Sequence, residues 1–248
     1  MRNFRVYLLG LLAVALTLAL ASDASAESLP PSVSILGVVG YPQQHNLSCE
    51  SRSATDTAAY WGGSFTEDEF FRRLPKSDNP HKGFLGDVDL PPGTMPPFGY
   101  GVYAGPIAAN LRTFGYDAEA HRNWDLESLK AELAAGRPVI VWATYDMRLP
   151  GVQTWVSWDG ETSLIVQWQH TFIAVGYDEE GVYLIDAYDA ETKHPSFESF
   201  DAAWAQLERL AVTVDGLAPA GPAPAWELAS SASGQRYVVD GRLVTEME

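Results

Sequence analysis

The sequence predicts an α+β protein in which N-terminal helices pack on an antiparallel β-sheet. Helical patterns occupy the first half of the 248-residue chain, and β-rich segments cluster in the second half. The segments are joined by short connections, among them Asp159-Gly160 and Glu179-Glu180-Gly181, which are turn sequences suited to antiparallel neighbours. A doubly wound nucleotide-binding fold would instead alternate strands with helices along the chain.

Each expected helix has a start or stop signal of its own. The first opens at Ser48 or Cys49 and runs to about Trp61, where two glycines follow. Thr66 and Glu69 form a capping box for a short second helix. The expected helical ranges are 48–61, 66–75, 105–115, 125–136 and 200–210.

The expected strands are short and mostly apolar. The run from Pro138 to Trp142 is β-rich and apolar, which predicts a buried strand. Further strands are expected over residues 116–121, 154–158, 164–168, 171–177, 182–185 and 211–214.

Residues 75–101 form a long irregular stretch that is rich in proline and glycine. Such a stretch within a compact domain is usually functional or disordered. Its aromatic residues, which include Phe84, Phe98 and Tyr100, indicate that it is ordered.

The N-terminus predicts export. Arg2 and Arg5 precede the apolar run Val6 to Ala21, and Ala24-Ser25-Ala26 follows as a small-x-small cleavage site. This pattern is typical of a secretory signal peptide over residues 1–26, cut after Ala26. A permanent membrane anchor is the alternative, but the run is shorter than the roughly 20 residues that a spanning helix needs. We therefore expect a secreted protein with no stable membrane insertion after cleavage.

One domain is expected over residues 27–215, followed by a tail over 216–248. The tail begins with a Pro/Ala linker, Ala218 to Pro224, and its residues 236–245 could form a small hairpin.

The chain has 32 acidic and 16 basic residues and a net charge of −16. Binding to nucleic acid or to an anionic membrane would require a basic face, so neither is expected. No residue pair has recognised metal-ligand spacing, and no cofactor is expected.

Cys49 is the only cysteine of the chain. In an exported protein it cannot form an internal disulfide, so it is a buried spectator, an intermolecular bridge or a reactive thiol. Its place at a helix start favours the reactive thiol, because the positive end of the helix dipole stabilises a thiolate.

A thiol nucleophile needs a base and a group that orients the base. Of the five histidines, His170 opens a strand, and Asp186 closes the next strand. The start of one strand lies beside the end of the next in an antiparallel hairpin, so we expect the two side chains to meet. Taken alone, His170 could be a structural histidine, Asp186 a turn residue and Cys49 an inert core thiol.

Gln43, Cys49, His170 and Asp186 together resemble the C39 peptidase-like family of papain-like cysteine peptidases, in its free-standing exported form. The resemblance covers roughly residues 33–214. It implies a papain-like fold and an enzyme that cleaves peptide or protein substrates through a thioester acyl-enzyme. It further implies that Cys49 is the nucleophile, His170 the general base and acid, and Asp186 its orienting partner. Gln43 would form the oxyanion hole with the backbone N–H of Cys49.

The chain departs from this family at two places. Ser48-Cys49-Glu50 stands where many members have Asp-Cys-Gly, and Ala187 rather than proline follows the aspartate. Two other functions stay open: a catalytically idle C39-like binding domain at the cell surface, and a cell-wall amidase. We also expect Trp168 and Tyr100 to bind substrate.

Overall fold

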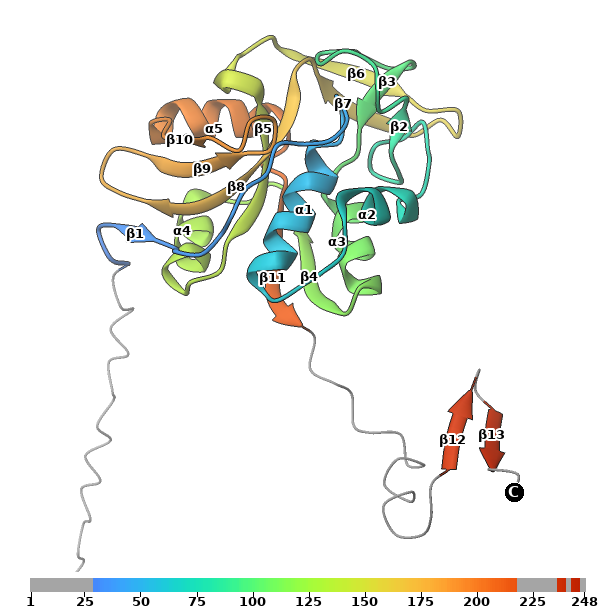
Figure 1. Ribbon diagram of the computed structural model, residues 1–248. Helices are drawn as coiled ribbons and strands as arrows, with labels where there is room; N and C mark the ends of the chain where they lie inside the picture. The colour runs from blue at the N-terminus through green and yellow to red at the C-terminus, as the bar shows by residue number, and fades with distance from the viewer. Residues whose placement is uncertain (1–28, 218–235, 240–241, 246–248) are drawn as a thin grey trace, which may run out of the picture.

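The computed structural model describes residues 29–217, 236–239 and 242–245 (Figure 1). The expected signal peptide and the Pro/Ala linker lie outside these residues. Within them, no helix combines the length and the apolar character needed to cross a bilayer.

The described chain contains helices and strands in the order expected of an α+β protein, which confirms the predicted class. The helices are α1 (Cys49–Tyr60), α2 (Glu67–Arg73), α3 (Ala104–Thr113), α4 (Leu126–Ala134) and α5 (Phe197–Gln206), with one 3-10 turn, η1 (Tyr145–Met147). The strands are β1 (Val33–Ser34), β2 (Leu85–Gly86), β3 (Gly99–Gly101), β4 (Tyr116–His121), β5 (Val139–Thr144), β6 (Val152–Val156), β7 (Thr162–Val166), β8 (Gln169–Tyr177), β9 (Val182–Asp186), β10 (Thr192–Lys193), β11 (Ala211–Leu217), β12 (Arg236–Val239) and β13 (Arg242–Thr245).

The main sheet has seven strands, in the order β10-β9-β8-β5-β11-β4, with β1 paired to β8. Every pair in it is antiparallel. Strands β12 and β13 pair with each other antiparallel.

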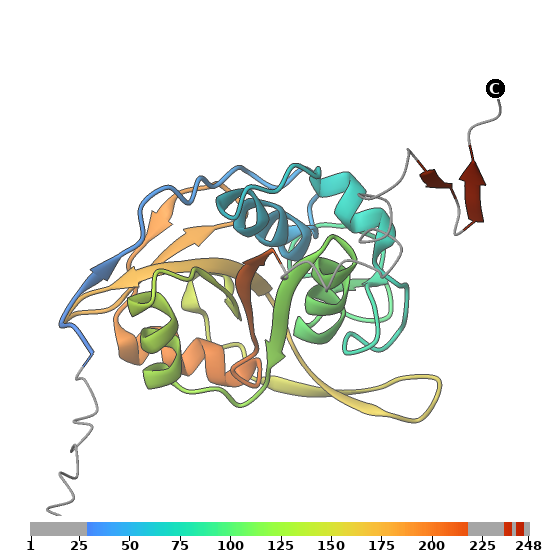
Figure 2. The ribbon, with the colours of Figure 1, turned by 90° about the horizontal axis from the view of Figure 1, so that it is seen from below.

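Helices cover both faces of this sheet, as Figure 2 shows from below. On one face, Trp142 and Val212 pack in a core with residues of α1 and α3. On the other face, Val141 and Phe172 pack with α4 and α5, where Trp204 is fully buried. Alternate residues of one strand therefore serve two cores, because strand side chains point to opposite faces in turn.

Two helix starts differ from expectation. Helix α5 begins at Phe197 instead of Phe200, because the side chain of Ser196 caps it by accepting from the Ser199 N–H. Helix α3 begins at Ala104, so Pro106 is its third residue instead of its first. The N–H groups of the first turn have no partner within a helix, so proline is tolerated there. The capping box of α2, by contrast, is formed as predicted.

The stretch over residues 75–101 is ordered, as its aromatic residues indicated. Phe84 and Tyr100 are buried, although Phe98 is 73% exposed. The arm formed by β6 and β7 is hydrogen-bonded to this stretch. Trp155 donates its Nε1–H to the carbonyl of Asp78 at 2.6 Å.

Candidate active site

Cys49 is the first residue of α1 and is only 3% exposed. The loop that leads to it is fixed by Glu67, a buried residue of α2. The Glu67 carboxylate accepts hydrogen bonds from the backbone N–H of Gln44 at 3.0 Å and from the hydroxyl of Ser48. Arg52 on α1 donates to the same carboxylate at 3.3 Å. The start of α1 is thus tied to α2 by buried polar contacts.

His170 and Asp186 meet across two neighbouring strands. Phe172 lies opposite Asp186 in the register of β8 and β9, and His170 precedes Phe172 by two residues on the same face. The His170 Nε2 lies 2.6 Å from the Asp186 Oδ1, and both side chains are buried. This contact leaves Nδ1 as the ring nitrogen that can face a thiol.

A cavity of about 300 Å³ brings four of the six predicted site residues together. Its lining includes Cys49 from α1, His170 from β8, Gln43 from the preceding loop and Trp168 from the β7–β8 turn. The other lining residues are Asn46, Leu47, Pro92, Gly93, Tyr145, Gln169 and Tyr188. Asp186 lies behind His170, outside this lining.

Tyr100 differs from the expectation that it binds substrate. It is buried in the core, and its hydroxyl is bonded to that of Tyr103 at 2.7 Å. The Val166 N–H also donates to it, at 2.9 Å. The cavity lining does not include Tyr100, because these partners hold its hydroxyl in the core.

The thiol of Cys49 is directed at its neighbour Glu50. The Sγ donates to the Glu50 Oε2 at 3.3 Å, and the hydrogen bonds of the described residues include none between Sγ and the His170 ring. Burial raises the pKa of the thiol well above its ordinary value, and the charge of Glu50 raises it further. A hydrogen bond from Thr171 acts in the opposite direction on this pKa.

Gln43 lies at the cavity with its amide group turned to its own loop. Its Nε2 donates to the carbonyls of His45 and Asn46, each at 2.8 Å. Its Oε1 is buried without a partner among the described residues. An oxyanion requires a donor, so one of these N–H groups has to leave its carbonyl before Gln43 could serve.

Glu50, Tyr145 and Tyr188 are residues of this region that the sequence reasoning gave no role. Tyr145 packs edge-on against His170, with ring centroids 5.7 Å apart, and against Tyr188 at 5.8 Å. The position of Tyr188 just after Asp186 was a usable signal, because a residue that follows a strand end lies at the same sheet edge. Tyr145 had a similar signal in its place after β5, the strand beside β8.

A comparison with known protein families identifies the family of this chain. A family model described as the Peptidase_C39 like family matches residues 35–212. The chain belongs to this family. The match begins before the loop that carries Gln43 and ends within β11, so it spans every candidate site residue.

Two relatives extend the comparison. YvpB of Bacillus subtilis strain 168, an uncharacterised protein, is 27% identical over 206 residues, which cover 77% of this chain and 79% of YvpB. A crystal structure from Bacillus anthracis, assigned as a C39-like peptidase, superposes with a TM-score of 0.67 at 24% identity. That match covers 76% of this chain and all of the other. The expected fold of a C39-like peptidase is therefore the fold of this chain.

Proposed function

We propose that this C39-like protein is an exported cysteine peptidase that cleaves amide bonds of peptide or protein substrates. One observation carries the proposal: Cys49, at a helix start, shares a cavity with His170, whose far nitrogen lies 2.6 Å from a buried carboxylate. Nucleophile, base and orienting group come from three separate elements. This is the arrangement that thiol acyl transfer needs.

The chemistry follows from these roles. His170 takes the proton of Cys49 at Nδ1, and the thiolate attacks the substrate carbonyl carbon. The backbone N–H of Cys49 and a released N–H of Gln43 hold the resulting oxyanion. His170 then gives its proton to the leaving amine as the C–N bond breaks, which leaves a thioester on Cys49. Water, deprotonated by His170, hydrolyses the thioester and restores the thiol.

Asp186 orients the ring throughout this cycle. Its Oδ1 also accepts the backbone N–H of Tyr188 at 2.8 Å, which fixes the carboxylate in place. The walls of the cavity carry no Asp, Glu, Lys or Arg and include three aromatic rings, so they suit an uncharged segment of substrate chain.

The test uses the chain from Glu27 onward, with an unstructured protein and a pooled peptide library as substrates. We expect hydrolysis that falls by at least about 10³-fold in Cys49→Ala, because the nucleophile is lost. Mass spectrometry after an acid quench should find an acyl adduct on Cys49 of the wild type. Hydrolysis that survives Cys49→Ala, or a complete lack of hydrolysis by the wild type, would contradict the proposal.

A second function, an idle binding domain, is favoured by one observation: the resting thiol is bonded to Glu50 and not to His170. A binding domain would retain a peptide or cell-wall ligand equally well after Cys49→Ser. Equilibrium binding to both forms, measured beside the hydrolysis assay, separates the two functions.

A further inference from the structure

Glu50 is a buried carboxyl that touches three parts of the candidate active site. It is 1% exposed. Its Oε1 accepts the backbone N–H of Val102 and the Nε2–H of Gln169, both at 2.9 Å. Its Oε2 faces the thiol of Cys49 at 3.3 Å. One side chain thus contacts the helix start, the segment after β3 and the residue just before His170.

The surrounding backbone makes room for this carboxyl. Gly101 has a φ of +127°, and a Cβ at that position would collide with the Glu50 Oε1 and the Gln169 Nε2. A side chain at residue 101 would therefore displace the carboxyl from its partners. Because residue 101 has no side chain, the β3 backbone can pack directly against the Glu50 carboxyl.

Within the described part of the chain, the Glu50 carboxyl has no ion-pair partner. The titratable groups around it are Cys49 on its own helix, Tyr100 on β3, Tyr103 at the start of α3, and His170, which adjoins Gln169 on β8. Of these, only His170 can carry a positive charge, and its Nε2 is engaged with Asp186.

A carboxylate and a thiolate in contact, both out of water, would place two negative charges side by side. Such a pair ionises in two steps, because the first charge opposes the second. We propose that Glu50 and Cys49 share one proton, so that Glu50 controls when Cys49 becomes a nucleophile. In the resting protein the proton is on the Cys49 sulfur, and the Glu50 carboxylate accepts a hydrogen bond from this S–H group.

Below the pH of the second ionisation step, formation of the thiolate then requires that Glu50 be neutral. Either the proton of Cys49 moves to the Glu50 Oε2, which gives a thiolate beside a carboxylic acid, or His170 takes it while Glu50 is already protonated. Charge is conserved in each step and no further reactant is needed. Burial raises the pKa of Glu50, which brings its protonated form closer to neutral pH. The inference rests on the proposed function only in taking Cys49 as the reacting group.

The experiment measures the rate of Cys49 alkylation by iodoacetamide against pH, without substrate, in the wild type and in Glu50→Gln. Glutamine keeps an oxygen for Val102 and Gln169, and it removes the charge beside the sulfur. The midpoint of the wild-type profile should lie above that of an ordinary thiol. In Glu50→Gln it should fall by about one pH unit or more, because the thiolate no longer faces an anion.

The matched control is Glu208→Gln, which also neutralises a buried glutamate, one that pairs with Arg122 away from the cavity. Its midpoint should stay within about 0.3 pH units of the wild type. A Glu50→Gln midpoint that does not fall, or that falls only as far as the control, would overturn the inference. Thermal unfolding of each variant verifies that the folded protein is compared. The assay needs no hydrolysis, so its result stands apart from the test of the peptidase proposal.

Discussion

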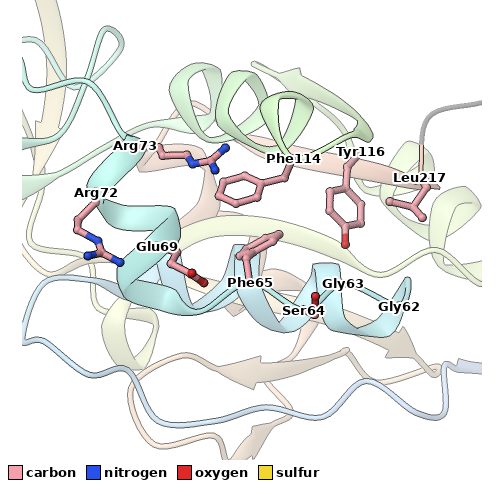
Figure 3. A pocket seen from close by; sticks show the side chains of 10 residues that line it. All are labelled: Gly62, Gly63, Ser64, Phe65, Glu69, Arg72, Arg73, Phe114, Tyr116 and Leu217. Atoms are coloured by element: carbon pink, nitrogen blue, oxygen red, sulfur yellow. The ribbon is translucent and has the colours of Figure 1, made fainter. Parts of the chain in front are cut away.

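Two cavities of this protein differ in what their aromatic and charged side chains contact. The cavity that contains Cys49 and His170 has a volume of about 300 Å³, whereas one near the far end of α1 measures about 570 Å³ (Figure 3). The larger cavity is lined by Gly62, Gly63, Ser64, Phe65, Glu69, Arg72, Arg73, Phe114, Tyr116 and Leu217. It has neither a thiol nor an imidazole in its lining.

In the larger cavity the aromatic rings pack on one another. Phe65 and Phe114 have ring centroids 4.2 Å apart, and the Arg73 guanidinium lies 4.1 Å above the Phe114 ring. In the smaller cavity the rings of Tyr145, Trp168 and Tyr188 surround space beside the thiol. The candidate active site is therefore not the larger of these two cavities. It is marked instead by a nucleophile and an oriented base that face the same space.

The largest expected effect that sharpens this comparison comes from Asp186→Asn. It removes the charge behind His170 and should lower kcat/KM for hydrolysis by about 10²-fold or more, because an amide stabilises imidazolium poorly. The chain contains a matched pair elsewhere, His194 and Asp178, with Nε2 and Oδ1 3.1 Å apart near the surface. Asp178→Asn should leave kcat/KM within about twofold. Equal losses in both variants would remove the basis for assigning the site to His170.

Removing one aromatic ring from each cavity should have a smaller effect. The change should be in KM for one cavity and in the free energy of unfolding for the other. Trp168→Ala should raise KM about tenfold, equivalent to ~1.4 kcal/mol of lost substrate contact, with little change in the unfolding midpoint. Phe114→Ala should instead lower the free energy of unfolding by about 1–3 kcal/mol and leave KM unchanged. Steady-state kinetics and denaturant unfolding of both variants test this. A KM effect from Phe114→Ala would assign a substrate role to the larger cavity.

The smallest expected effect concerns His45, which lies on the loop before Cys49. Its ring nitrogens contact Asp89 at 2.8 Å and Asp68 at 3.0 Å, and these hydrogen bonds raise the pKa of His45. A raised folded-state pKa contributes stability that is full below the ordinary histidine pKa and is lost as pH rises through the folded value. His45→Gln should therefore lower Tm by about 1–3 °C at pH 5.5 and by less at pH 8.5. A larger loss at the higher pH would contradict this sign.

The parts of the site that were predictable depend on local pattern and on hairpin register. The start of α1 and the capping box of α2 follow from sequence signals within a few residues. The meeting of His170 with Asp186 follows from two strands joined by a short turn. In each case the residues that decide the contact are close in the chain or are related by a regular pairing.

The parts that were missed depend on residues distant in the chain. An acidic residue in the first turn of a helix is ordinarily an exposed partner of the helix dipole, so Glu50 gave no sign of burial. Its place is decided by Val102 and Gln169, far along the chain. The burial of Tyr100 was missed for the same reason, since the Val166 N–H that donates to its hydroxyl belongs to the β6–β7 arm. Such contacts become visible only when the whole fold is formed.

The burial of the thiol at the start of α1 has a consequence for the lifetime of the protein in air. Oxidation of cysteine to sulfenic and then to sulfinic acid depends on thiolate character and on exposure. Cys49 is 3% exposed and its pKa is raised, so oxidants meet a shielded, protonated sulfur. The chain has no second cysteine that could rescue a sulfenic acid as an internal disulfide. Burial and the raised pKa of Cys49 therefore slow the first oxidation step, and the chain has no internal disulfide with which to reverse it.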